Sequence, residues 1–346
     1  MNPEGVPVHS IQAQGKFSGW HARWDRYGIL VIFFVLLVLA SIGAPHFLSF
    51  SNFLNVLQTM SFVLFVALGQ TLVILSGGMD LSHGSLVSLS CMATAAVVAA
   101  GHPWLGLLAG LSVGAFCGLI NGILIGIVRL NAIIATLGML YISGGLALYF
   151  TDGKSISGID VNKVQGFHFL AEGKLFHIPF VIYLALFFLV LTHFLLRHTR
   201  FGNHVYALGG NEAVAEIAGI NFSRMKIVIF VLSGLSCGMA GALLTARMLT
   251  GEPQVGAGTF LLESIGAVVV GGNDIFGGVG NVGRTAIGLM ILHFLGNALN
   301  LMGISTFSQQ VVVGVVVLLF CYFGLARRRQ RHPSVGITLK GALQHR

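Results

Sequence analysis

Apolar residues gather in ten long runs, and short polar segments separate these runs. A run of about 17–25 apolar residues can cross the hydrocarbon core of a membrane as one helix. We therefore predict an all-α membrane protein, a polytopic bundle of about ten transmembrane helices within residues 27–326. Residues 1–26 form a polar lead-in, and residues 327–346 form a basic tail. The predicted spans are 27–45, 54–76, 85–100, 104–128, 131–150, 178–196, 224–247, 255–272, 284–302 and 309–326.

The composition excludes an ordinary soluble domain. Of the 346 residues, 55% are hydrophobic and only 9% are charged, whereas soluble domains carry about 25% charged residues. The net charge of +8 does not indicate nucleic-acid binding, because the basic residues lie at span ends and in the tail. A nucleic-acid interface would place them in one stripe or patch. The lipid bilayer is therefore the expected environment.

The basic residues also predict the orientation of the chain. With the N-terminus in the cytoplasm, ten spans place 15 of the 19 lysines and arginines on the inner side and four on the outer side. This excess follows the positive-inside rule. We expect both termini and the polar loop 197–223 in the cytoplasm. The long loop 151–177 is then outside and open to a soluble partner.

The polar loop 197–223 contains a predicted short helix at residues 211–219. Asn211 can cap this helix, Glu212 lies in the first turn where the helix dipole favours negative charge, and Gly219 can end it. An apolar stripe at helical spacing is formed by Ala213, Val214, Ile217 and Ala218. Two interpretations stand equally at this point: a docking site for a partner, or an interfacial helix that lies on lipid headgroups.

Glycines recur at spacing four in the fourth predicted span, at positions 110, 114, 118, 122 and 126. Residues four apart share one helix face, and without Cβ atoms a neighbouring backbone can approach that face closely. Gly234 and Gly238 repeat the spacing in the seventh span. The pattern predicts close helix packing and carries no information about chemistry.

Two predicted inner turns share the form G-G-x-D, at residues 77–80 and 271–274. The similarity hints at an internal duplication of about five spans. In the first turn, the motif residues are Gly77, Gly78, Asp80 and Ser82. We expect Asp80 and Ser82 to cap the third span, a structural role that we favour over a functional one. A carboxylate within the membrane would otherwise indicate function.

Amide side chains within the spans are candidates for a translocation path. A neutral, hydroxyl-rich solute could pass along such groups without being held tightly. The alternative, hydrogen bonding between helices, is the more common role of a buried amide. The path candidates are Gln70, Asn121, Asn297 and Asn300.

Catalytic and metal-binding motifs are absent from the sequence. Neither G-x-S-x-G nor H-E-x-x-H occurs, and Gly153-Lys154-Ser155 lacks the leading glycine of a phosphate-binding loop. We expect no enzyme activity, no cofactor and no metal in this chain. A rival class, an ion-coupled secondary transporter, needs an ionisable relay in the membrane, for which Glu263 is the candidate.

Several motifs, in order from about residue 30 to 326, resemble the permease subunit of ribose-type monosaccharide ABC importers. They are L-S-G-G-M-D-L-S at 75–82, A-T-L-G-M at 135–139, R-F-G at 200–202, A-L-G-G-N-E at 207–212, G-I-N at 219–221, A-V-V-V-G-G at 267–272 and N-L-M-G-I-S at 300–305.

The resemblance implies a permease of the bacterial inner membrane, paired with a second copy of itself or a close paralogue. It further implies a periplasmic sugar-binding protein on the outside. A cytosolic ATP-binding subunit, which would hold ATP and Mg²⁺, would dock on the loop helix. The residues to which the resemblance assigns this coupling are Gly210, Asn211, Glu212, Ala215, Glu216 and Gly219.

Overall fold

The computed structural model describes residues 18–331. Residues 1–17 and 332–346, which include most of the predicted lead-in and tail, lie outside the described residues. The first part of the chain forms α1 (Ser18–Gly43), α2 (Phe50–Leu75), α3 (His83–Ala99), α4 (Pro103–Gly126), α5 (Ala132–Tyr149), a 3-10 turn (Val161–Lys163) and α6 (Gln165–Glu172). The remainder forms β1 (Lys174–Leu175), β2 (Ile178–Pro179), α7 (Phe180–His198), α8 (Arg200–Gly210), α9 (Glu212–Ile217), α10 (Phe222–Met248), α11 (Thr259–Val270), α12 (Val282–Leu301) and α13 (Thr306–Arg331).

The predicted all-α membrane architecture is confirmed, and the predicted count of about ten spans is compatible with the helices. Among the described residues, six helices are long and apolar enough to cross a membrane: α2, α4, α5, α7, α10 and α12. Four shorter apolar helices coincide with the remaining predicted spans, at Gly28–Gly43, His83–Ala99, Thr259–Val270 and Thr306–Tyr322. A single antiparallel hairpin, β1–β2, is the only sheet in this part of the chain.

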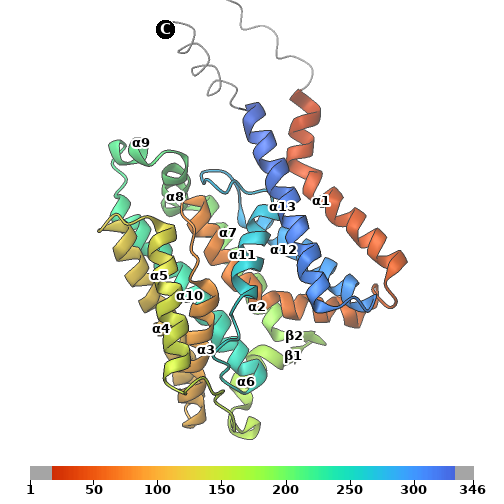
Figure 1. Cartoon of the computed structure of the whole chain (residues 1–346), viewed down its shortest axis with the longest axis vertical. Helices are drawn as coiled ribbons and strands as arrows, with labels where there is room; N and C mark the ends of the chain where they lie inside the picture. Colours follow the sequence, from red (N-terminus) through yellow and green to blue (C-terminus); the bar gives the residue numbers. More distant parts are fainter. Residues whose placement is uncertain (1–17, 332–346) are drawn as a thin grey trace, which may run out of the picture.

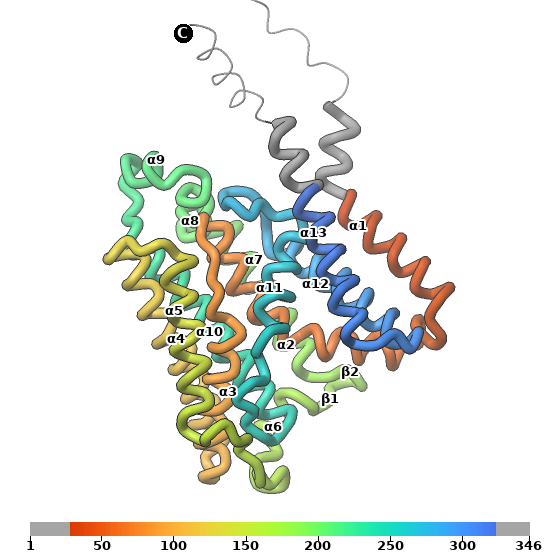
Figure 2. Tube along the Cα trace, viewed as in Figure 1, coloured from red at the N-terminus to blue at the C-terminus, as the bar shows by residue number. Residues whose placement is uncertain are grey.

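The helices pack as two groups joined by α2 (Figures 1 and 2). The larger group contains α3, α4, α5 and α10, and its core continues through most of α2. The smaller group contains α1, α12 and α13, which pack around Phe294 and the beginning of α2. The rings of Phe33 and Phe47 meet the Phe294 ring edge-on, at centroid distances of 5.8 and 6.1 Å. One end of the molecule carries α9, and we call it the α9 side.

The glycine ladder of α4 packs against α10, as its spacing predicts. A Cβ on Gly114 would overlap the carbonyl oxygen of Gly234, and a Cβ on Gly238 would lie 2.7 Å from the carbonyl oxygen of Gly110. Further along, a Cβ on Gly122 would lie 2.7 Å from the Cα atom of Ile227. The two backbones are therefore in contact along most of both helices, and no larger side chain fits between them.

Two spans are only partly helical. With 17 and 12 residues, α3 and α11 reach about 25 and 18 Å at 1.5 Å per residue, less than the roughly 30 Å of a hydrocarbon core. Irregular backbone precedes each helix, and the two helices occupy opposite halves of the bundle (Figure 1). The first turn of α3 meets the irregular segment before α11 at Gly84 and Gly256, where a Cβ on either residue would overlap the other's carbonyl oxygen.

Candidate functional site at the α9 side and in the bundle interior

The loop helix predicted at residues 211–219 is present as α9, and a second helix, α8, precedes it. Asn211 ends α8 and caps α9 as predicted, because its Oδ1 accepts a hydrogen bond from the Val214 N–H at 3.1 Å. Gly219 follows α9 with φ of +86°, a conformation in which glycine carries no steric cost. These two residues keep α9 short and set it apart from the bundle (Figure 1).

Three loops meet at glycines beneath α8. A Cβ on Gly209 would overlap the Leu75 carbonyl oxygen at the end of α2. The Gly278 N–H donates to that same oxygen at 3.0 Å. The first G-G-x-D turn, at Gly77, and the loop that follows the second turn, at Gly277 and Gly278, thus lie against the end of α8. These contacts are between backbones, so no side chain separates α8 from the segments that follow α2 and α11.

Arg129 ties α9 to the turn between α4 and α5. Its Nη1 donates to Glu212 Oε1 at 2.8 Å, and its Nη2 forms an ion pair with Glu216. Its guanidinium carbon lies 3.8 Å from the centroid of the Phe222 ring at the start of α10. One side chain therefore joins α9, the α4–α5 turn and α10. The sequence offered a weak signal for this contact, a lone arginine between two spans on the same predicted side as two glutamates.

The remaining surface of α9 is apolar and exposed. Val214 is 59% exposed and Ile217 is 88% exposed, and Ala213 and Ala218 are exposed as well. The predicted stripe therefore faces outward. Ala215 is 3% exposed and packs into the core. The polar face of α9 binds the permease itself, whereas the apolar face is open to another molecule.

Lys226, at the beginning of α10, is a second cation that sequence reasoning did not single out. It is 4% exposed, and its Nζ donates to the Ser76 carbonyl oxygen at 2.8 Å and to Ser76 Oγ at 3.3 Å. The same nitrogen lies 5.5 Å from the centroid of the Phe222 ring. Lys226 thus donates a hydrogen bond to a carbonyl at the C-terminal end of α2, where helical partners are lacking, and joins α2 to α10.

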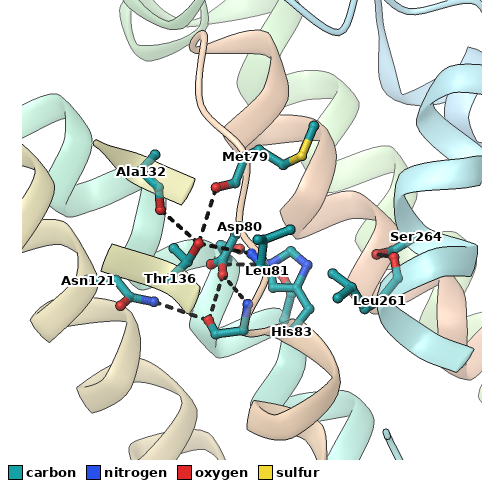
Figure 3. Close-up of polar contacts among 12 residues, drawn as sticks. Met79, Asp80, Leu81, His83, Asn121, Ala132, Thr136, Leu261 and Ser264 are labelled. Carbon is teal, nitrogen blue, oxygen red and sulfur yellow. Dashed lines mark hydrogen bonds and ion pairs between the residues drawn. The ribbon is translucent and has the colours of Figure 1, made fainter. Parts of the chain in front are cut away.

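Polar side chains in the bundle interior satisfy the irregular backbone before α3 (Figure 3). Asp80 Oδ1 accepts from the N–H and the hydroxyl of Ser82 at 2.9 and 2.6 Å. Thr136 Oγ1 accepts from the Leu81 N–H at 3.1 Å. Non-helical backbone at membrane depth requires such partners. The predicted cap is wrong in detail, since Ser82 occupies the N-cap position without capping α3 and donates its hydroxyl to Asp80 instead.

Three atoms of this interior cluster have no hydrogen-bond partner among the described residues: Asp80 Oδ2, His83 Nδ1 and Asn121 Oδ1. His83 Nε2 is bound to Ser233 Oγ at 2.6 Å and lies 3.5 Å from Asp80 Oδ2. The Asn121 amide donates to Ser82 Oγ at 3.2 Å. These atoms leave hydrogen-bonding capacity for a water molecule or a solute hydroxyl.

The four path candidates do not come together. Gln70 and Asn121 are completely buried in the larger group of helices, and the Gln70 amide has no hydrogen-bond partner in the described part of the chain. Asn297 forms a reciprocal amide pair with Asn52, at 2.8 and 2.9 Å, which joins α12 to α2. Asn300 is exposed near the end of α12. Only the first two therefore lie in the bundle interior.

Glu263 of α11 has a specific neighbour, because its Oε2 lies 3.4 Å from His293 Nε2 of α12. The carboxylate is 34% exposed, so it is not isolated in an apolar environment. Within residues 18–331, no group of three or more His, Cys, Asp or Glu side chains comes together as a metal site.

Comparison with known proteins gives concordant matches. A family model described as the permease component of branched-chain amino acid transport systems matches residues 52–321. The ribose import permease of Escherichia coli K12 is 36% identical over 291 residues, which cover 84% of this chain and 90% of that protein. The ribose import permease of Bacillus subtilis is 38% identical, over 91% of this chain and 97% of its own length.

An arabinose permease is similar to the same degree. The L-arabinose transport system permease protein of Escherichia coli K12 is 37% identical over 309 residues, covering 89% of this chain and 93% of that protein. No solved structure matches the chain.

Proposed function

This chain belongs to the permease family of branched-chain amino acid transport systems, and from that membership we propose that it is the membrane-spanning subunit of an ATP-driven importer. Its proposed cargo is a monosaccharide or a related polyol. The observation that carries this proposal is the similarity, over at least 84% of the chain, to import permeases for ribose and arabinose. These relatives favour a sugar over the branched-chain amino acids in the family's name.

The α9 side is the proposed cytosolic side, with both termini on it and the protein in a bacterial inner membrane. A separate ATP-binding subunit docks on the exposed apolar face of α9. That subunit binds ATP and Mg²⁺, so the permease needs no cofactor of its own. The excess of basic residues on this side supports the orientation. The exposure of Val214 and Ile217, while Glu212 and Glu216 are bound to Arg129, supports the docking face.

The opposite side receives a periplasmic sugar-binding protein in this proposal. There, α6 and the β1–β2 hairpin lie together, and Arg247 at the end of α10 donates to Glu172 of α6 at 3.1 Å. A second permease copy or a close paralogue completes the path. ATP binding closes two ATP-binding subunits and moves α9, and the glycine contacts beneath α8 pass this movement to α2 and α11.

Reconstitution tests this function. The permease is placed in liposomes with the ATP-binding subunit and the sugar-binding protein encoded beside it, and uptake of labelled ribose, arabinose and leucine is measured. We expect uptake of a sugar that requires ATP, the ATP-binding subunit and the binding protein together. Uptake by the permease alone, or uptake that an uncoupler abolishes while ATP is present, would contradict the proposal.

Arg129→Gln is expected to reduce sugar uptake per ATP hydrolysed, because α9 loses its tie to the α4–α5 turn. The loss in stability should be small, since exposed ion pairs contribute about 0.2–1 kcal/mol each. Arg224→Gln is the matched control, because Arg224 is also exposed near α9 and forms no ion pair with the described residues. If the two variants take up the same amount of sugar per ATP hydrolysed, Arg129 has no role in passing movement from α9 to the bundle.

A further inference from the structure

A polar cleft opens on the α9 side, between the end of α7, helix α8 and the beginning of α12. Its volume is about 520 Å³, and none of the residues that line it belongs to α9. Its lining includes His193, Arg197, His198, Asn203, Tyr206 and Gly280. The cleft shares no lining residue with the coupling contacts described above. Within it, Tyr206 donates a hydrogen bond to the Gly280 carbonyl oxygen at 2.9 Å.

The lining is basic and rich in hydrogen-bond donors. Arg197, His193 and His198 come from the last turns of α7, and the Asn203 amide comes from α8. Arg197 has no hydrogen bond or ion pair among the described residues, and none of the lining residues is Asp or Glu. A guanidinium presents five donors in a fixed fork that suits phosphate oxygens. The cleft is therefore equipped for an oxyanion.

The surroundings of Tyr206 place a second guanidinium close to this cleft. Burial raises the pKa of the Tyr206 phenol above its usual value, while the charges of Arg197 and Arg284 lower it. Both arginines are thus near enough to act on one hydroxyl group. The Asp274 carboxylate, on the loop before α12, accepts a hydrogen bond from the Phe276 N–H at 2.9 Å. Two cations thus lie at Tyr206, Arg197 in the lining and Arg284 beside it, and one carboxylate, Asp274, lies on the neighbouring loop.

An apolar helix face leads into the cleft. Phe187, Val190 and Phe194 of α7 are 60%, 58% and 56% exposed, so this face of α7 is free to contact acyl chains. The Phe194 ring stacks on the His198 ring at a centroid distance of 5.3 Å. A molecule that carries both a phosphate and long apolar chains matches this combination, whereas free phosphate would use only the basic part.

We propose that the cleft binds the phosphate group of an anionic phospholipid in the leaflet on the α9 side. Arg197 is the principal cation, His198 and Asn203 supply further donors, and the acyl chains lie along the exposed face of α7. Basic pockets between membrane helices recognise headgroups in this way. The lipid would fill the angle between α7 and α8 and brace the beginning of α12.

Native mass spectrometry of the purified full-length permease tests this site. The protein is titrated with phosphatidylglycerol or phosphatidylcholine of the same acyl composition. We expect phosphatidylglycerol to bind more tightly than phosphatidylcholine. Arg197→Gln should lower the affinity for phosphatidylglycerol about fivefold, the effect of one basic residue near an anionic membrane. Arg200→Gln is the matched control, because Arg200 is exposed three residues further along the chain but does not line the cleft.

Three outcomes would overturn the proposal. In the first, both arginine variants lose phosphatidylglycerol equally, which would indicate diffuse surface charge. In the second, inorganic phosphate displaces the lipid at equal concentration, which would assign the cleft to a free anion. In the third, Arg197→Gln keeps its lipid but no longer retains the ATP-binding subunit, which would assign the cleft to a protein partner.

Discussion

The double variant Val214→Asp/Ile217→Asp is expected to lose the ATP-binding subunit and, with it, all ATP-dependent uptake. Both side chains are exposed apolar groups on a short protruding helix, and a buried apolar anchor in an interface is worth about 2 kcal/mol or more. Two carboxylates would also have to be desolvated without a partner. We expect affinity for the ATP-binding subunit to fall at least about thirtyfold, as measured by co-purification and titration.

The control for this prediction is Phe176→Asp at the hairpin on the opposite side. Phe176 is 83% exposed, and its φ of +52° is one that aspartate adopts more readily than phenylalanine. This variant should retain the ATP-binding subunit. If the α9 variant also retains it, then the docking assignment is wrong and the alternative, an interfacial helix, is favoured.

Gly114→Leu is expected to prevent correct packing of the bundle. The leucine Cβ would overlap the Gly234 carbonyl oxygen, and α4 and α10 would have to separate along their whole contact. Overpacking of a core typically costs about 1–3 kcal/mol, and here the obstacle is backbone that cannot change rotamer. We therefore expect at least about 3 kcal/mol of destabilisation, seen as loss of the monodisperse peak in size-exclusion chromatography and a lower Tm.

Gly138→Leu provides the comparison, because Gly138 lies in the neighbouring α5 and a Cβ there meets no atom within 4 Å. This variant should elute and melt like the parent protein. Equal losses in both variants would show that leucine is harmful at any glycine of these helices, and the specific contact between α4 and α10 would then not explain the effect.

Patterns along one helix were readable from the sequence. The spans followed from apolar runs, the packing of α4 followed from the spacing of Gly110 and Gly114, and the Asn211 cap followed from its position before α9. Each of these features depends on residues that are close in sequence. Helical periodicity and capping are local properties, so one sequence carries them.

Contacts between distant segments were not readable. Arg129 and Glu212 are 83 positions apart, and Lys226 and Ser76 are 150 apart, so no periodicity links them. The predicted capping of α3 by Ser82 was wrong because it also depended on the arrangement of neighbouring segments. The chain before α3 is irregular at membrane depth, and its own N–H groups take the Asp80 and Thr136 oxygens that a regular helix start would leave free.

Scattered amides were the least informative signal. Asn297 and Gln70 look alike in the sequence, yet Asn297 joins two helices through Asn52 whereas the Gln70 amide has no partner among the described residues. An amide in an apolar run indicates only that some polar partner is needed. Whether that partner is another helix, water or a solute depends on the three-dimensional arrangement.

The close contact between α4 and α10 has a consequence for biosynthesis. The ribosome releases α4 well before α10, and all of α5 to α9 is made in between. Until α10 is inserted, the part of the α4 glycine face at Gly114, Gly118 and Gly122 lacks the backbone against which it packs, and lipid chains or the insertion machinery must cover it. The amino-terminal half of the permease thus cannot mature as a separate unit, and a nascent chain that stalls before α10 should be a substrate for membrane quality control.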